Sequence, residues 1–263
     1  MTPSDRWQIH RHLATDSNER LAIVRHAPQQ ISLIGADADI SRSLLAARYP
    51  KAAFAEYDPR AGFLAAAADM RKSGLWQKLT GKNVPQQQQS LTAPLPEAAA
   101  DMLWANLSLI TAADLPAVFD NWARHLQTDG MLFFTHFGID SLQDLLGRLN
   151  ARGITATAPT LIDMHDLGDM LFHHGFYDPV MDTAKIELSY QTAAAFWQDM
   201  ETLGLWAALR FTDEAAARTA VETMWQNGEI SSITLETVYG HAVKKLTLPE
   251  GESPVQFFPK RTS

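Results

Sequence analysis

The stretch ISLIGADADI, from Ile31 to Ile40, decides how the first half of the chain is interpreted. Its apolar start predicts the first strand of an α/β sheet, and its polar end lies where such folds place a ligand-binding loop. Loops that hold a nucleotide need several glycines, because the backbone must turn tightly and approach the ligand closely. Here Gly35 is the single glycine, and Asp37 and Asp39 take the alternate positions where further glycines would be expected. The pattern indicates a cofactor-binding fold whose cofactor loop is altered.

Strand-like and helix-like segments alternate around this stretch. The runs ISLI and AAFAEY (Ala52 to Tyr57) flank SRSLLAARYP, which predicts a helix closed by Pro50. A second pair of strands, DMLWANL and MLFFTHF, is joined by the helical stretch LPAVFDNWARHL and a turn at Thr128-Asp129-Gly130. This alternation favours an α/β fold in which a parallel sheet carries helices on both faces.

The rest of the chain is more helical. We interpret NVPQQQQSLTAPLPEAAA (Asn83 to Ala100) as a loop with a weak third strand at most. The stretch from Leu161 to Phe176 predicts a helix with Asp163 as its N-cap and Gly175 at its end. A strand (179–190), two helices (192–203 and 212–227) and a closing strand (233–246) follow. We expect a single domain over residues 1–245, a small helical cap inserted within about 138–220, and a C-terminal tail over 246–263.

Composition excludes several classes of function. The net charge of -8 and the pI near 5.5 argue against nucleic acid as the main ligand, because binding phosphates needs a clustered basic surface. The absence of cysteine removes disulfides, thiol nucleophiles and thiolate-bound metals. Asp37, Asp39 and Asp58 are interpreted as solvated acids rather than a metal site, since hard cations need a convergent cage of oxygens. No signal peptide or membrane span is evident, so we expect a cytoplasmic protein with no membrane partner.

Three blocks of the chain resemble the BioC-type malonyl-[acyl-carrier protein] O-methyltransferases of biotin synthesis. They are DMLWANLSLITAADLPAVFDNWARHLQTDGMLFFTHFG (101–138), LIDMHDLGDMLFHHGFYDPVMDTAKIELSY (161–190) and VYGHAVKK (238–245). The resemblance covers roughly residues 19–245. It implies a Rossmann-like class I methyltransferase sheet, S-adenosylmethionine (SAM) as the methyl donor, and a malonyl thioester on acyl-carrier protein as the substrate and partner. The implied reaction esterifies the free malonyl carboxylate.

The resemblance also implies cofactor-binding positions. Asp58 matches the acid that holds the ribose hydroxyls, Gly35 matches the first loop glycine, and Asn106 matches the residue that ends the fourth strand. A carboxylate suits the ribose because it accepts from two hydroxyls at once. Asp37 takes one further position of the cofactor loop, and Gln89 stands where the family has an aspartate for the adenine amino group.

The sequence departs from the family elsewhere. Asp37 and Asp39 replace loop glycines, and Ile110-Thr111 replaces a Gln-Trp pair. The aromatic N-terminal helix that covers the family's active site has no convincing match in MTPSDRWQIHRHLATDSN. These departures concern the cofactor rather than the scaffold.

Candidate substrate-binding residues follow from position within the matched blocks. They are His165, Tyr190, Tyr239 and His241. Arg42 or Arg210 could also meet a malonyl carboxylate, because guanidinium binds carboxylate through two parallel hydrogen bonds. A catalytic residue is not assigned, since an ionised carboxylate needs no base before it accepts a methyl group.

Two hypotheses therefore remain at this stage. In the first, the chain is a divergent malonyl-carrier-protein methyltransferase that binds SAM through a modified loop. In the second, it is a pseudo-methyltransferase that has lost SAM binding and serves as a carrier-protein-binding or scaffolding partner. The altered loop is the feature on which they differ.

Overall fold

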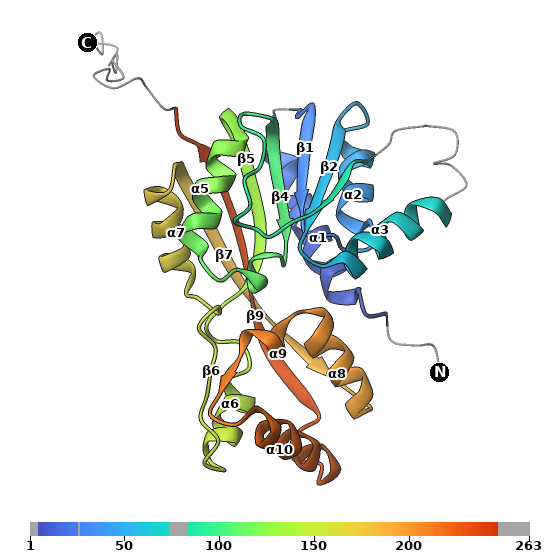
Figure 1. The fold of residues 1–263 in the computed structure, drawn as a ribbon, viewed down its shortest axis with the longest axis vertical. Helices are drawn as coiled ribbons and strands as arrows, with labels where there is room; N and C mark the ends of the chain where they lie inside the picture. The colour runs from blue at the N-terminus through green and yellow to red at the C-terminus, as the bar shows by residue number, and fades with distance from the viewer. Residues whose placement is uncertain (1–4, 26, 74–83, 247–263) are drawn as a thin grey trace, which may run out of the picture.

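The computed structural model describes residues 5–25, 27–73 and 84–246, and it shows a sheet flanked by helices with a smaller helical part at one end (Figure 1). The sheet has seven strands in the order β3-β2-β1-β4-β5-β9-β7. The first five pair in parallel, whereas β9 runs antiparallel between β5 and β7. The strands are β1 (Gln30–Ile34), β2 (Ala53–Asp58), β3 (Gln86–Gln88), β4 (Ala100–Asn106), β5 (Leu126–Phe137), β7 (Phe176–Ser189) and β9 (Ser232–Lys244). The predicted Rossmann-like sheet is confirmed, including the weak third strand.

Helices cover both faces of the sheet because successive strand residues point to opposite sides. In β4, Leu103 and Ala105 pack with the core beneath α5 (Leu115–His125) and α7 (Met164–His173). The alternate residues Met102 and Trp104 pack on the other face. That face is covered by α1 (Gln8–Arg20), α2 (Ile40–Arg48) and α3 (Ala61–Ser73). Among the described residues no helix is both long and apolar enough to cross a membrane.

Local signals placed the helix ends correctly where a cap was present. Asp163 caps α7 and its side chain accepts from the His165 backbone N–H, as predicted. Gly175 lies just beyond that helix with φ of +95°, a conformation that glycine adopts without strain.

The predicted turn at residues 128–130 is wrong. This segment is part of β5, which runs without interruption from Leu126 to Phe137. The strand accommodates the extra residues through a register shift opposite Ala100 and Met102, and Asp129 takes a positive φ of 62°. A bulge in a long strand therefore carries the Asp-Gly signal that usually marks a turn.

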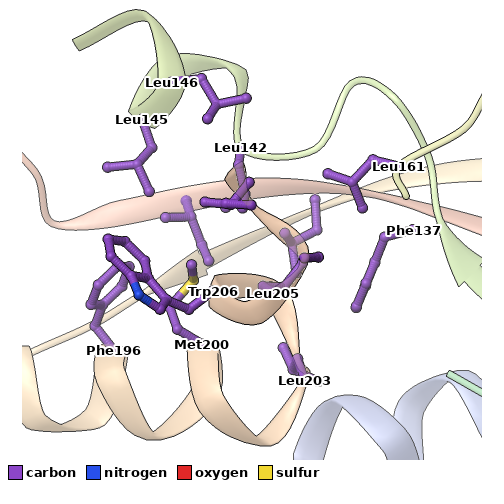
Figure 2. Packing of buried hydrophobic residues seen from close by; sticks show 14 of the residues in the cluster. Phe137, Leu142, Leu145, Leu146, Leu161, Phe196, Met200, Leu203, Leu205 and Trp206 are labelled. Carbon is purple, nitrogen blue, oxygen red and sulfur yellow. The ribbon is translucent and has the colours of Figure 1, made fainter. Parts of the chain in front are cut away.

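The smaller part is a helical cap whose apolar cluster continues to Phe137 at the end of β5 (Figure 2) and to Ile9 and Leu13 of α1. Phe196 and Met200 of α8 are fully buried there, and Trp206 packs edge-on against Trp197 with ring centroids 4.9 Å apart. Trp225 packs against the same cluster. Its elements are α6 (Gln143–Asn150), α8 (Ala193–Thr202), α9 (Leu205–Ala208), α10 (Glu214–Gln226) and the short strand pair β6 (Ala156–Thr157) and β8 (Arg210–Phe211).

Gly240 in β9 has no room for a side chain. A Cβ atom there would lie 2.3 Å from two ring carbons of Phe134, which sits directly opposite in β5. Gly240→Ala should therefore lower the free energy of unfolding by about 1–3 kcal/mol through overpacking. Urea titration would measure the loss, with Gly147→Ala as the matched control, because a Cβ at Gly147 in α6 meets nothing within 4 Å. Equal stability of the two variants would contradict the expectation.

Candidate functional site

The carboxyl ends of β1, β2 and β4 bring the predicted cofactor residues together. The backbone N–H of Ala36, next to Gly35, donates to the Asp58 carboxylate at 2.7 Å. Asn106 at the end of β4 donates its amide to the Asp37 carboxylate, also at 2.7 Å. In open parallel sheets this edge is where ligands bind. Three segments distant in sequence thus form one locus, as predicted.

Asp58 is fully buried and accepts hydrogen bonds from four N–H groups. The Ala36 backbone supplies one, and Arg60 supplies its backbone N–H at 2.7 Å together with Nε and Nη2 at 2.9 Å each. The guanidinium of Arg60 also lies over the ring of Phe63, 3.7 Å from its centroid. Since an ionised carboxylate offers about four acceptor positions, those of Asp58 are all in use.

The loop after β1 keeps a glycine-like backbone without the glycines. Ala38 and Asp39 have φ values of 54° and 69°, in the left-handed region that aspartate tolerates better than most residues. The Asp37 carboxylate accepts from the Ser41 backbone N–H at 3.0 Å and from the Ser41 hydroxyl at 2.6 Å. Burial raises the pKa of Asp37. The interpretation of Asp37, Asp39 and Asp58 as solvated acids is wrong, because all three are buried. Asp37 binds the first turn of α2 and Asn106.

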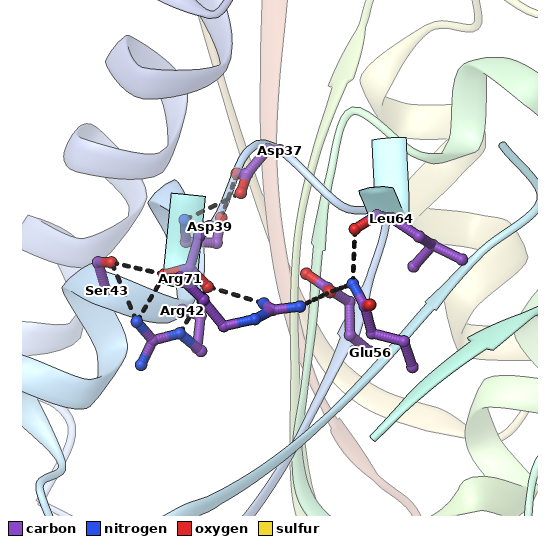
Figure 3. Close-up of polar contacts among 9 residues, drawn as sticks. Asp37, Asp39, Arg42, Ser43, Glu56, Leu64 and Arg71 are labelled. Carbon is purple, nitrogen blue, oxygen red and sulfur yellow. Dashed lines mark hydrogen bonds and ion pairs between the residues drawn. The ribbon is translucent and has the colours of Figure 1, made fainter. Parts of the chain in front are cut away.

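Asp39 belongs to a separate chain of buried ion pairs (Figure 3). Arg42 forms two hydrogen bonds to its carboxylate, at 2.6 and 2.5 Å, and Arg71 donates at 2.8 Å. Arg71 continues to Glu56 at 2.9 Å, which also accepts from Gln86 at 2.6 Å. Burial raises the pKa of Glu56. Arg42, one of the candidates for a substrate carboxylate, is therefore paired within the chain.

These acids do not form a metal centre in the part of the chain that the structure describes, where no three His, Asp or Glu side chains gather as ligands.

The N-terminal segment folds as a helix that packs over this edge, although its sequence gave no match to such a helix. Trp7, just before α1, makes edge contacts with His10 and Phe63 at 5.1 and 4.8 Å between ring centroids. Asn106 donates to the backbone carbonyl of His10 at 3.0 Å. The apolar spacing of Ile9 and Leu13, both buried, was the signal that could have revealed the helix.

Two buried polar side chains near this edge have no hydrogen-bond partner among the described residues, and sequence reasoning singled out neither. They are the His10 ring, unpaired at both nitrogens, and the Ser108 hydroxyl. Burial, with Arg60 and Arg6 nearby, lowers the pKa of His10 to about 3, so its ring is neutral. Ser108 is close to the loop, because a Cβ at Gly35 would lie 3.0 Å from the Ser108 Cβ.

Gln89 also reaches this edge. It follows β3, and its backbone N–H donates to the Asp58 carbonyl at 3.3 Å. Its side-chain amide donates to the Ala93 carbonyl at 3.4 Å. The position predicted for adenine recognition therefore lies beside Asp58.

The four predicted substrate residues lie in four different surroundings. His165 is exposed on α7 and contacts Asp163, whereas Tyr190 packs in the cap against Phe196 and Trp225. Tyr239 donates to Asp16 of α1 at 3.0 Å, and burial raises the pKa of its hydroxyl to about 12. His241 in β9 stacks on Phe133 of the neighbouring strand β5, with ring centroids 5.4 Å apart. Arg210 donates to two carbonyls of the cap, those of Ala207 and Leu209.

Comparison with known proteins shows that this fold is that of methyltransferases. Residues 34–134 match the family model described as a methyltransferase domain. The YcgJ protein from Bacillus subtilis superposes with a TM-score of 0.58 at 16% identity, covering 90% of this chain and 99% of that one. Phosphoethanolamine N-methyltransferase 2 of Haemonchus contortus, solved with S-adenosyl-L-methionine, gives a TM-score of 0.55 at 13% identity over 89% of this chain and 53% of that one. At such identities the two structures establish the fold.

A curated relative establishes more. The malonyl-[acyl-carrier protein] O-methyltransferase of Methylovorus sp. (strain MP688) is 31% identical, over 93% of this chain and 86% of its own length. The match runs through the sheet and the cap alike, so it extends well beyond the methyltransferase domain. By that similarity over nearly the whole chain, the protein belongs to the malonyl-[acyl-carrier protein] O-methyltransferase family.

Proposed function

We propose that this protein transfers a methyl group from SAM to the free carboxylate of a malonyl thioester on acyl-carrier protein. The observation that carries the proposal is the 31% identity, over 93% of this chain, to a malonyl-[acyl-carrier protein] O-methyltransferase. A supporting observation is that the buried side chains of His10 and Ser108, near the carboxyl edge of the sheet, have no hydrogen-bond partner among the described residues. A buried polar group without a hydrogen bond costs about 1–3 kcal/mol, so such groups usually face a ligand or an ordered water.

The residues at this edge fit the cofactor in their chemistry. Asp58 would accept from the ribose hydroxyls, the backbone beside Gly35 would lie against the ligand, and Gln89 would face the adenine. SAM, when bound, supplies a methyl group on a positively charged sulfur. Of the two aspartates that replace loop glycines, Asp39 has a positive φ of 69°, a conformation that glycine adopts readily.

Methylation of the malonyl carboxylate does not require a general base. A malonyl carboxylate is ionised near neutral pH, so the protein must place it and exclude water rather than remove a proton. Burial lowers the pKa of His136, at the carboxyl end of β5, to about 4, and His10 is likewise neutral, so neither ring adds charge beside the acceptor. Of the four substrate candidates, Tyr239 lies nearest this edge, because it pairs with Thr135 near the carboxyl end of β5. His165 and Tyr190 lie apart from it, on α7 and in the cap.

Asp58→Ala tests the proposal. Introduced together with Arg60→Gln, which frees the Asp58 carboxylate of its guanidinium partner, the loss of the Asp58 hydrogen bonds should weaken S-adenosylhomocysteine binding by about 1.5–3 kcal/mol, roughly ten- to hundredfold, relative to Arg60→Gln alone. Calorimetric titration would measure the affinity, and transfer of labelled methyl to malonyl-carrier protein would measure the activity.

Asp101→Ala is the matched control. Asp101 lies at the opposite end of β4, and its carboxylate likewise accepts two backbone N–H groups, from Gln29 and Gln30. It should keep the parent affinity for S-adenosylhomocysteine. Equal affinity of Arg60→Gln and Asp58→Ala/Arg60→Gln would move the ribose away from Asp58.

A second candidate is the pseudo-methyltransferase, and the Asp58–Arg60 pair favours it. A carboxylate whose acceptor positions are all used inside the protein has none left for ribose. Under this function the parent would bind malonyl-carrier protein but neither bind S-adenosylhomocysteine nor transfer methyl. The same titration and transfer assay therefore separate the two candidates.

A further inference from the structure

Arg60 presents to Asp58 the hydrogen-bond pattern that a ribose would present. Its Nε donates to one carboxylate oxygen and its Nη2 to the other, each at 2.9 Å. A ribose offers two neighbouring hydroxyl donors, which a carboxylate accepts in the same paired manner. The guanidinium and the diol therefore compete for the same acceptors.

The position of Arg60 allows it to leave. Its side chain is 22% exposed, whereas the Asp58 carboxylate is fully buried. Its guanidinium also lies over the ring of Phe63. The remaining two donors to Asp58 are backbone N–H groups, of Ala36 and of Arg60 itself, and these can stay in place when the side chain swings away.

We propose that the Arg60 side chain competes with ribose for the Asp58 carboxylate. A nucleoside then binds Asp58 only by displacing the Arg60 guanidinium. This inference rests on the proposed function, because it takes SAM as the ligand. A ligand with both ribose hydroxyls can replace both guanidinium bonds, whereas one that lacks a hydroxyl leaves an acceptor of the buried Asp58 carboxylate unpaired. Competition by Arg60 also predicts that the parent binds its cofactor more weakly than the pocket alone would allow.

The test compares S-adenosylhomocysteine binding by the parent, Arg60→Gln and Arg60→Lys in calorimetric titrations. Arg60→Gln should bind about ten- to hundredfold more tightly, since the ligand no longer breaks charged hydrogen bonds. Arg60→Lys should lie between the two, because lysine keeps the charge but lacks the paired donors. Arg148→Gln is the matched control, as Arg148 pairs with exposed Asp144 on α6, in the cap.

A second readout does not depend on catalysis. Thermal unfolding with saturating S-adenosylhomocysteine should show a larger ligand-induced rise in melting temperature for Arg60→Gln than for the parent, because stabilisation by a ligand increases with its affinity. The double variant Asp58→Ala/Arg60→Gln should not show the larger rise in melting temperature, since the carboxylate that binds the ribose is removed. If Arg60→Gln proves too unstable to titrate, Arg60→Lys provides the comparison.

The outcomes separate this inference from the proposed function. Equal or weaker binding by Arg60→Gln and Arg60→Lys, with methyl transfer intact in the parent, overturns the inference and leaves the function standing. Absence of S-adenosylhomocysteine binding in every variant, together with absence of methyl transfer, overturns both. Tighter binding by Arg60→Gln that vanishes in the double variant supports the inference.

Discussion

Arg71→Ala is expected to lower the free energy of unfolding by about 3–5 kcal/mol, the range for removing one partner of a buried ion pair. Arg71 is 14% exposed in its side chain and connects Asp39 to Glu56, whose side chain is 1% exposed (Figure 3). Without it, Glu56 keeps only the Gln86 amide among the polar partners described for its side chain. Guanidinium chloride titration would measure the loss.

Two further variants test whether the loss comes from the buried ion pairs. Arg148→Ala removes an arginine from the exposed pair with Asp144, and such pairs contribute less than about 1 kcal/mol. Adding Glu56→Gln to Arg71→Ala should recover part of the stability, because the uncompensated charge is gone. Similar losses for Arg71→Ala and Arg148→Ala would show that the network behaves as a surface pair.

The pH dependence of stability should also change when His10 is replaced. The pKa of His10 is about 3 in the folded chain, below its ordinary value of 6.5, because the ring is buried. As the pH falls below 6.5 the unfolded chain therefore takes up a proton that the folded chain does not, and stability declines until the pH reaches about 3. For one group the decline is about 1.4 kcal/mol per pH unit.

His10→Phe keeps an aromatic ring against Trp7 and Phe63 but removes the titrating group. Between pH 6 and pH 4, the parent should lose about 2.5 kcal/mol more than the variant does. Urea titrations at several pH values would measure the difference, in which contributions common to both chains cancel, including that of His136. His173→Phe, at an exposed position of α7, should follow the parent. Parallel curves for the parent and His10→Phe would contradict the burial of a neutral ring.

Periodicity was sufficient to predict the scaffold. Apolar runs of strand length and capped helical stretches act over a few residues, so the elements around Ile31–Ile34 and the Asp163 cap follow from local sequence. Asp58 could be placed at the carboxyl edge for the same reason, because a parallel strand ends there. The Asp-Gly pair at 129–130 led to a wrong prediction of a turn, because the same residue types also favour a bulge within a strand.

The contents of the site could not be predicted in this way. Arg60 lies two residues from Asp58, but whether its side chain turns back onto the carboxylate depends on the Phe63 ring beneath it. His10 meets Asn106 across 96 residues of sequence, a contact that no local pattern encodes. Sequence identified which residue types stand at the edge, while the tertiary packing determines which of them are already paired.

The long pairing of β7 with β9 bears on how the protein unfolds. The pairing begins with Phe176 opposite Lys244, within the main part of the sheet, and ends with Ser189 opposite Ser232, next to the cap. It has one irregularity, between Tyr177 and Val180. Both parts are therefore built on the same two strands rather than joined by a linker (Figure 1). Neither part could be excised without cutting through a hydrogen-bonded ribbon, so we expect the sheet and the cap to unfold as one cooperative unit.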